Sequence, residues 1–272
     1  MTHGAHSAPT PAVKAALLSA LHVPGDPLIV TNVWDAMTAR IVARTPGVRA
    51  LATASHSVAF ALGVPDGEGM TVEQALDAAA RIAASTDLPV SVDFERGYAV
   101  DAAGVHDNVA RLIDAGGAGL NIEDSLDGAT SDRRPLAEAA ARVAAARAAA
   151  DAAGVPLAIN ARTDTLAGSP DNWSEAIDRA NAYVDAGATS IFMLGLGTEQ
   201  KVADAVAAVR APIAVFAHPG YVSLARLAEL GVGRISFGPQ TLGLTLHHLA
   251  AAAEQVTARG EYPAELTYRY DL

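Results

Sequence analysis

Short apolar runs alternate with longer stretches rich in alanine along most of the chain. Several of these runs are apolar without a polar residue at every second position, which is the pattern of parallel strands buried on both faces. The runs recur about every 29 residues, close to the length of one strand–helix–strand unit. Eight of them are present, at residues 28–32, 49–55, 89–95, 119–124, 156–163, 190–196, 212–219 and 234–239.

The stretches between the runs have the composition of helices. Thr71 and Ser174 are candidate N-caps, and glycines follow several of the expected helix ends. Helices are therefore expected at 71–85, 102–115, 136–153, 174–186, 199–209, 223–230 and 242–258. Regular alternation of eight strands with helices predicts a (β/α)₈ barrel of the TIM type.

The barrel accounts for nearly the whole length of 272 residues. No linker rich in Pro, Gly or Ser interrupts the series, so residues 1–272 are expected to form a single α/β domain. Residues 1–12 are expected to be a flexible lead-in and 259–272 a C-terminal tail. The N-terminus lacks the basic start and apolar stretch of a signal peptide, which makes the cytoplasm the expected location.

Composition excludes several classes of function. Hydrophobic residues make up 51% of the chain and charged residues 18%, which argues against disorder. The net charge of −11 argues against nucleic acid as a partner, and no apolar run is long enough to span a membrane. The chain has no cysteine, so disulfides, zinc–thiolate sites, iron–sulfur clusters and a cysteine nucleophile are all excluded.

Carboxylates gather where consecutive strands are expected to end. Asp93 and Glu95 are two residues apart and so share one face of a strand, and Glu123 ends the next strand. Active sites of such barrels lie at the carboxyl ends of the strands, and three acids at one point favour a hard cation such as Mg²⁺. The alternative is a structural cluster of ion pairs with Arg96 and Arg162.

Arg162, also at a strand end, is the clearest candidate for binding a carboxylate or phosphate, because its guanidinium can bind such a group with two parallel hydrogen bonds. An ion pair with Glu123 or Asp164 is the alternative role. His218 is a candidate proton shuttle, and His56 is a weaker one.

Five motifs, taken in order, resemble the isocitrate lyase/phosphoenolpyruvate mutase superfamily. They are NVWDA at 32–36, LGVPD at 62–66, SVDFERGY at 91–98, NIED at 121–124 and NARTD at 160–164, and the resemblance extends over roughly residues 28–253. It implies a barrel that assembles as a homo-oligomer, a dimer or tetramer, with its last helix swapped between partners. It also implies a Mg²⁺ site, with Mn²⁺ as an alternative, and 2-oxo acid chemistry through an enolate-like state.

The resemblance also assigns roles to individual residues. Asp93 would be the main metal ligand, Glu95 and Glu123 would hold the metal through water, and Asp66 would lie near those waters. The residues expected to bind a small carboxylate substrate are Trp34, Ala54, Ser55 and Arg162.

The sequence departs from the superfamily where its acid–base chemistry is expected. Lyases carry Lys-Lys-Cys-Gly-His after the Glu-Asp pair, whereas residues 125–134 here contain no Cys, Lys or His. Phosphonomutases carry Lys-x-Asn where this chain has Ala129-Thr130-Ser131. Leu194 stands where the lyases have Glu and the mutases have His. His218 or Tyr221 is therefore expected to supply the missing proton.

The expected function is that of a Mg²⁺-dependent enzyme acting on a small 2-oxo or 2-hydroxy acid. A carbon–carbon lyase or a decarboxylase of a diacid is the preferred version. Two alternatives remain: an oxo-acid-binding barrel that has lost catalysis, and a phosphonomutase or hydrolase that acts on a C–P bond. A zinc-dependent aldolase is disfavoured, because the sixth and seventh runs lack a pair of histidines at their ends.

Overall fold

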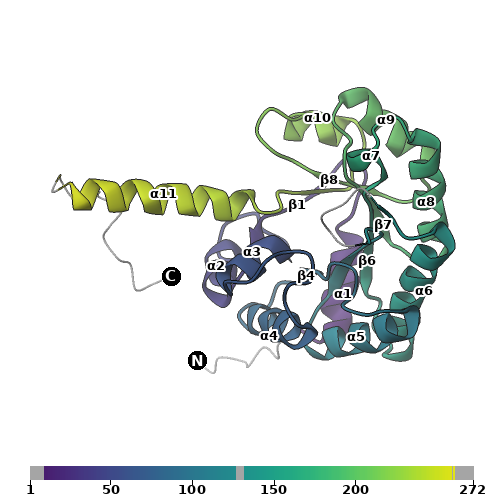
Figure 1. Cartoon of the computed structure of the whole chain (residues 1–272), viewed down its shortest axis with the longest axis horizontal. Helices are drawn as coiled ribbons and strands as arrows, with labels where there is room; N and C mark the ends of the chain where they lie inside the picture. Colours follow the sequence, from purple (N-terminus) through teal and green to yellow (C-terminus); the bar gives the residue numbers. More distant parts are fainter. Residues whose placement is uncertain (1–8, 127–131, 259, 261–272) are drawn as a thin grey trace, which may run out of the picture.

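The computed structural model describes residues 9–126, 132–258 and 260, and its strands form one parallel sheet (Figure 1). The strands run in the order β1-β9-β8-β7-β6-β5-β4-β3-β2. β1 (Leu28–Val30) pairs with β9 (Arg234–Ser236), whereas β2 (Asn32–Val33) pairs with β3 (Leu51–Thr53). Because β1 and β2 follow each other directly in the chain, they are two halves of one barrel strand. The sheet therefore closes into an eight-stranded barrel.

Every barrel strand coincides with one of the eight apolar runs, β2 extending one residue beyond the first run, which confirms the predicted fold. The remaining strands are β4 (Val90–Asp93), β5 (Gly119–Glu123), β6 (Ala158–Thr163), β7 (Ser190–Met193) and β8 (Ile213–Phe216).

The seven expected helices are present, with ends within two residues of the expected ones. They are α4 (Val72–Ala83), α5 (Ala102–Asp114), α6 (Leu136–Ala152), α8 (Trp173–Asp185), α9 (Glu199–Ala208), α10 (Leu224–Glu229) and α11 (Gln240–Thr257). Thr71 caps α4 as expected, but the expected Ser174 cap is wrong. α8 begins one residue before Ser174, and its N-cap residue Asn172 makes no side-chain capping bond.

Four further helices were not expected from the sequence: α1 (Pro11–Ala20), α2 (Ala36–Ala43), α3 (Ser55–Ala61) and α7 (Thr165–Gly168). α1 begins inside the expected lead-in, with Thr10 as its N-cap. Residues 1–8, and the expected tail apart from Gly260, lie outside the described residues.

α1 closes the amino-terminal end of the barrel. Leu18 of α1 is fully buried and packs with residues in or just before several strands, namely Leu28, Val30, Ala50, Ala52, Ala118 and Ala158. This end is therefore filled by apolar side chains, and the opposite, carboxyl end is left for a site.

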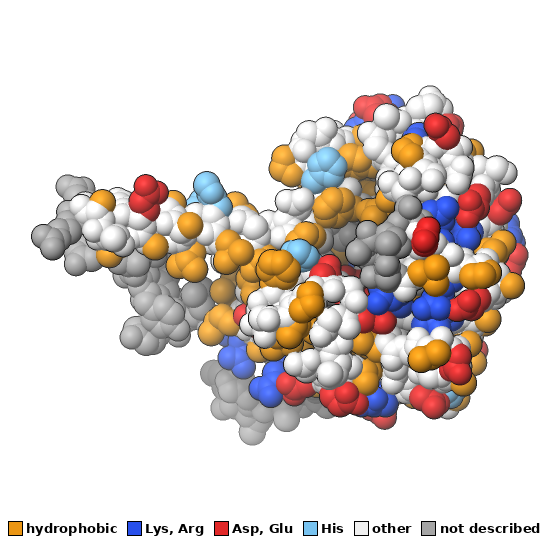
Figure 2. All heavy atoms as spheres, viewed as in Figure 1, with side chains coloured by type: hydrophobic (Ala, Val, Ile, Leu, Met, Phe, Trp, Pro, Cys, Tyr) orange, Lys and Arg blue, Asp and Glu red, His pale blue; other side chains and the backbone are white. Residues whose placement is uncertain are grey.

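α11 extends away from the barrel (Figure 1). Within this helix of 18 residues, Leu242 is the one buried residue. Leu244, Leu246 and Leu249 are exposed, so that hydrophobic side chains are visible along the helix (Figure 2). Of the helices in the described part of the chain, none is both long enough and apolar enough to cross a membrane.

Candidate active site

A cavity of about 270 Å³ opens at the carboxyl ends of the strands. One side of it is mostly polar and is lined by Asn32, Thr53, Ser55, His56, Asp66, Asp93, Asn121 and Arg162. The other side carries Phe192, Leu194, Phe216, Ser236, Gly238 and Pro239. The cavity thus lies at the end of the barrel where the site is expected from the sequence.

Asp93, the last residue of β4, faces this cavity and is held by its neighbours. The backbone N–H and the hydroxyl of Ser55 both donate to Oδ2 of Asp93, at 2.9 Å each. Asn121 Nδ2 donates to Oδ1 at 3.4 Å. These three hydrogen bonds fix the orientation of the carboxylate. Ser55, expected from the sequence to bind substrate, therefore contacts the expected metal ligand through both its amide and its hydroxyl.

Glu95 lies deeper, on a turn of unusual backbone geometry. Its φ is +45° and that of Tyr98 is +51°, in the left-handed region that side chains other than glycine rarely adopt. Tyr98 Oη donates to Glu95 Oε1 at 2.5 Å, and the backbone N–H of Glu68 donates to Oε2. Burial, together with the charges of Asp93 and Asp66, raises the pKa of Glu95 to about 7.

Arg162 lies between two carboxylates. Its Nε and Nη2 donate to the two oxygens of Asp164 at 2.6 and 2.7 Å, and its Nη1 is 2.9 Å from Oε2 of Glu123. Burial opposes the charge of Arg162, but the two carboxylates outweigh it and raise the pKa. The ion pairs considered as the alternative role of Arg162 are therefore present, and the same guanidinium also lines the cavity.

Glu123 is buried, and both of its carboxylate oxygens contact other side chains. Ser125 Oγ donates to Oε1 at 2.6 Å, while Oε2 faces Arg162. Burial raises its pKa, with a smaller contribution from Asp164. Arg96, the other cation of the alternative ion-pair cluster, pairs with Glu68 at 3.2 Å and with none of the three candidate metal ligands.

The donor set favours a metal ion held mostly through water. Within residues 9–126, 132–258 and 260, no three His, Asp or Glu side chains are close enough to hold an ion together. Asp93 lines the cavity, whereas the oxygens of Glu95 and Glu123 already accept hydrogen bonds or face Arg162. One direct carboxylate with several retained waters is how proteins commonly bind Mg²⁺. The residues therefore fit Mg²⁺ better than a cation that needs several protein ligands.

Two other candidate residues, His56 and Asp66, line the same cavity and contact each other. His56 Nδ1 is 3.4 Å from Oδ2 of Asp66, and both side chains are partly exposed. Phe60 stacks on the imidazole of His56, with ring centroids 4.2 Å apart. Ala54 also lines the cavity, but Trp34 does not, and its side chain packs against the hydrophobic core instead.

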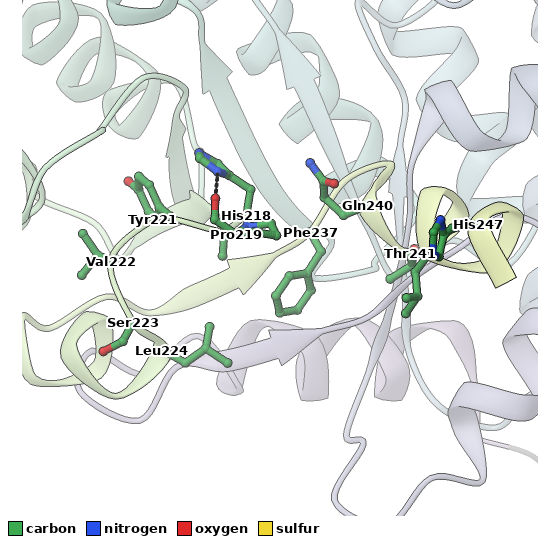
Figure 3. A pocket seen from close by; sticks show the side chains of 12 residues that line it. His218, Pro219, Tyr221, Val222, Ser223, Leu224, Phe237, Gln240, Thr241 and His247 are labelled. Carbon is green, nitrogen blue, oxygen red and sulfur yellow. Dashed lines mark hydrogen bonds between the residues drawn. The ribbon is translucent and has the colours of Figure 1, made fainter.

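His218 and Tyr221 lie beside the cavity and do not line it. They line a separate apolar pocket of about 620 Å³ between the start of α11 and the loop after β8 (Figure 3). His218 Nδ1 contacts the carbonyl oxygen of Pro219 at 2.9 Å, and burial raises the pKa of Tyr221 to about 12. A smaller pocket of about 90 Å³, which also contains Leu194 and Phe216, connects their position with the cavity wall.

Sequence reasoning did not identify every residue of the site. Tyr98 lies within a quoted motif, but the sequence gives no sign of its hydrogen bond to Glu95. Phe192 and Phe216 lie within two of the apolar runs, where a buried core residue and a residue of a cavity wall look the same in the sequence. The expected departures at Ala129, Thr130 and Ser131 lie outside the described residues.

The chain is similar in sequence to a family of known proteins. Residues 18–257 match the family profile of phosphoenolpyruvate phosphomutase. The 2-methylisocitrate lyase of Escherichia coli is 34% identical over 204 residues, 68% of each chain. The oxaloacetate decarboxylase of Bradyrhizobium sp. BTAi1 is 31% identical over 250 residues, which cover 87% of this chain and 85% of that one.

A solved structure extends the similarity to the fold. The crystal structure of a Burkholderia cenocepacia protein assigned as a phosphonomutase superposes with a TM-score of 0.86 at 43% identity. The match covers 89% of this chain and 99% of that one.

Proposed function

Because the chain belongs to the phosphoenolpyruvate phosphomutase family, within the isocitrate lyase/phosphoenolpyruvate mutase superfamily, we propose that it is a Mg²⁺-dependent carbon–carbon lyase or decarboxylase. Its substrate would be a small 2-oxo or 2-hydroxy acid that reacts through an enolate-like state. The observation that carries the proposal is the position of Asp93. It is oriented by Ser55 and Asn121 at the base of a cavity that Arg162 also lines.

The metal would be bound by Asp93 directly and by Glu95 and Glu123 through water. When bound, Mg²⁺ supplies a Lewis acid that polarises the 2-oxo group of the substrate. The donor set supports this assignment, since Asp93 lines the cavity, whereas Glu95 and Glu123 are buried and do not line it.

The protein's own groups would then bind and orient the substrate. Arg162 presents a fixed positive charge to a substrate carboxylate, because Asp164 holds two of its nitrogens. A positive charge held in place in advance stabilises negative charge as it develops on the reacting oxygens. Arg162 is partly buried, which strengthens this effect by keeping part of its surface away from water.

A proton donor is needed to complete the reaction after the bond breaks. We assign this role to His56, because its imidazole lines the cavity and is paired with Asp66. His218 and Tyr221, the donors expected from the sequence, remain the second candidates. Their side chains would reach the substrate through the small pocket beside Leu194.

The experiment is a panel of 2-oxo and 2-hydroxy acids incubated with the protein and Mg²⁺, with released pyruvate or another 2-oxo acid as the readout. Turnover that disappears with a chelator and in Asp93→Asn supports the proposal. Binding of panel members without any turnover would favour the alternative expected from the sequence, an oxo-acid-binding barrel without catalysis.

Phosphonate chemistry is the second candidate activity. The observation that favours it is the 43% identity with the Burkholderia cenocepacia protein assigned as a phosphonomutase. Adding phosphonopyruvate to the same panel, with ³¹P NMR as the readout, separates C–P from C–C chemistry.

We further propose that α11 packs against a second copy of the chain, as the superfamily resemblance implies. The support is its position outside the barrel and its exposed leucines (Figures 1 and 2). The apolar pocket between α11 and the loop after β8 offers a surface for the partner's helix (Figure 3).

A further inference from the structure

A row of polar side chains crosses four neighbouring strands of the barrel and ends at Asp93. Asp93 of β4 pairs in register with Asn121 of β5. Asn121 pairs with Asn160 of β6, which pairs in turn with Ser190 of β7. Register partners on parallel strands project from the same face of the sheet. This face is the inside of the barrel, because Asp93 and Asn121 line the cavity.

Hydrogen bonds join the four side chains in a single direction. Ser190 Oγ donates to Asn160 Oδ1 at 2.7 Å. Asn160 Nδ2 donates to Asn121 Oδ1 at 2.8 Å, and Asn121 Nδ2 donates to Asp93 Oδ1 at 3.4 Å. The other carboxylate oxygen of Asp93 accepts from Ser55. The row therefore holds one oxygen of Asp93, while Ser55 holds the other.

The carboxylate at the end of the row sets this direction. A carboxylate that binds a metal is ionised and only accepts hydrogen bonds, so Asn121 has to present its amide nitrogen to Asp93. Its oxygen then faces Asn160, which has to donate. If the amide of Asn121 were reversed, its oxygen would face the carboxylate and its nitrogen would face the nitrogen of Asn160. Asn160 thus keeps Asn121 in the orientation that binds Asp93.

The two residues at the far end of the row are buried away from the cavity. Asn160 and Ser190 are 2% and 1% exposed, and neither lines the cavity. A polar group buried in this way costs free energy unless it is hydrogen-bonded, and apolar side chains would fill the same space without that cost. Hydrogen bonds in a chain polarise one another, so each bond of the row strengthens the last one, at Asp93.

We propose that Asn160 and Ser190 are positioning residues for Asp93, which they orient through Asn121. This inference rests on the proposed function, in which Asp93 binds Mg²⁺ directly. Neither Asn160 nor Ser190 touches the metal or the substrate. They keep Asp93 Oδ1 in place, so that the carboxylate does not have to reorient when the ion binds.

The test measures Mn²⁺ affinity from the electron paramagnetic resonance signal of the free ion. Asn160→Leu keeps the branched shape of the side chain but removes its polar atoms. It should raise the Kd for Mn²⁺ about tenfold, since losing a group that orients a metal ligand commonly has an effect of this size. Ser190→Ala should raise the Kd by a smaller factor, because it removes only the last donor of the row.

Ser57→Ala is the matched control. Ser57 is fully buried like Ser190, but within the described part of the chain its hydroxyl has no hydrogen-bond partner. The same atom is therefore removed from an equally buried place outside the row, and the Kd for Mn²⁺ should not change.

The double variant separates a positioning role from a general disturbance of the fold. Asn160→Leu already disconnects Ser190 from Asp93, so adding Ser190→Ala should not raise the Kd further, whereas independent effects would multiply. Thermal unfolding of each variant verifies that it is folded at the temperature of the titration. Ser190→Ala, which removes a single oxygen atom, carries the test if Asn160→Leu does not fold.

The outcomes distinguish this inference from the proposed function. If the wild-type protein binds no Mn²⁺, the proposed function fails and the inference fails with it. If the wild type binds Mn²⁺ but Asn160→Leu and Ser190→Ala bind it equally tightly, the inference alone is overturned. It is also overturned if the two effects multiply, or if Ser57→Ala weakens binding as much. Weaker binding in both single variants, with no further loss in the double variant, supports it.

Discussion

The orientation of Arg162 depends on residues that do not themselves line the cavity. Asp164 binds two of its nitrogens, and the backbone N–H of Asp164 in turn donates to Asp124 at 3.1 Å. Asp124 is buried and also accepts from Tyr183 Oη at 2.7 Å. A chain of hydrogen bonds thus runs from α8 to the guanidinium that is proposed to bind the substrate.

Substituting Asp164→Asn should weaken oxalate binding about tenfold or more. The amide can accept one hydrogen bond in place of two, and a bond to a charged group contributes about 1.5–3 kcal/mol. Calorimetric titration with oxalate and Mg²⁺ measures the effect. The control is Asp185→Asn, which breaks an exposed pair with Arg210 and should change nothing. Unchanged oxalate affinity in Asp164→Asn would contradict this role.

His22, far from the cavity, should make stability depend on pH. Its Nδ1 lies 2.8 Å from the carbonyl oxygen of Leu18, and burial, with a further contribution from Arg234, lowers its pKa to about 4. Between about pH 6.5 and 4 the unfolded chain binds a proton that the folded protein does not, so stability falls as the pH falls through this window.

His22→Gln should remove that part of the pH dependence, up to about 3 kcal/mol between pH 7 and 4. Urea unfolding at a series of pH values measures it. His106→Gln, at a partly exposed site, is the control and should keep the wild-type profile. Parallel profiles for wild type and His22→Gln would show that His22 is protonated equally in both states.

The sequence predicts the positions of most site residues but not what each atom contacts. Asp93, Glu123 and Arg162 follow from their places at strand ends. The pairing of Arg162 with two carboxylates depends on side-chain rotamers. The separation of His218 from the cavity depends on the path of the loop after β8. Neither is encoded in a local pattern.

At the scale of elements, the long helices were predictable from the sequence and the short helices were not. α4 and α6 have the length and the composition that make a helix visible in a sequence. α2, α3 and α7 have 8, 7 and 4 residues, too few for a period to emerge. They form because the barrel fixes where each of them begins. For example, Asp35 caps α2 directly after β2.

The first residue of β5 is under tight packing constraints. A Cβ at Gly119 would lie 2.6 Å from the carbonyl oxygen of Ala158 and 2.7 Å from Leu18 of α1. Gly119→Ala should therefore destabilise the fold by about 1–3 kcal/mol, the usual effect of overpacking. Denaturant unfolding tests this.

Gly243 of α11 is the matched control, because a Cβ there meets nothing within 4 Å. Gly243→Ala should be neutral or stabilising by up to about 1 kcal/mol through helix propensity. Equal effects of the two substitutions would contradict the packing of α1 against β5 and β6.

The exposed face of α11 predicts association of the chain. Light scattering should give a mass that is a multiple of 27.7 kDa. The double substitution Leu244→Asp and Leu249→Asp should lower the measured mass toward that of a single chain. These leucines are 60% and 64% exposed here and would be buried by a partner. A wild-type protein that stays monomeric at high micromolar concentration would rule out the swapped helix.

At the scale of the whole molecule, the barrel explains why motifs from distant parts of the chain form one site. Strands β3, β4 and β6 each contribute one or two polar residues at their carboxyl ends, and parallel pairing brings those ends together. The fold and this polar side were predictable from strand spacing and motifs. The apolar side was not, because Phe192 and Phe216 have the sequence signal of ordinary core residues.

The central claim is that Asp93 and Arg162 support enolate chemistry on a 2-oxo acid. The most direct measurement is exchange of the methyl protons of pyruvate in D₂O, followed by ¹H NMR with and without Mg²⁺. We predict exchange that requires both the protein and Mg²⁺ and that is lost in Asp93→Asn. Tight binding of oxalate with no exchange at the pyruvate methyl group would contradict the claim.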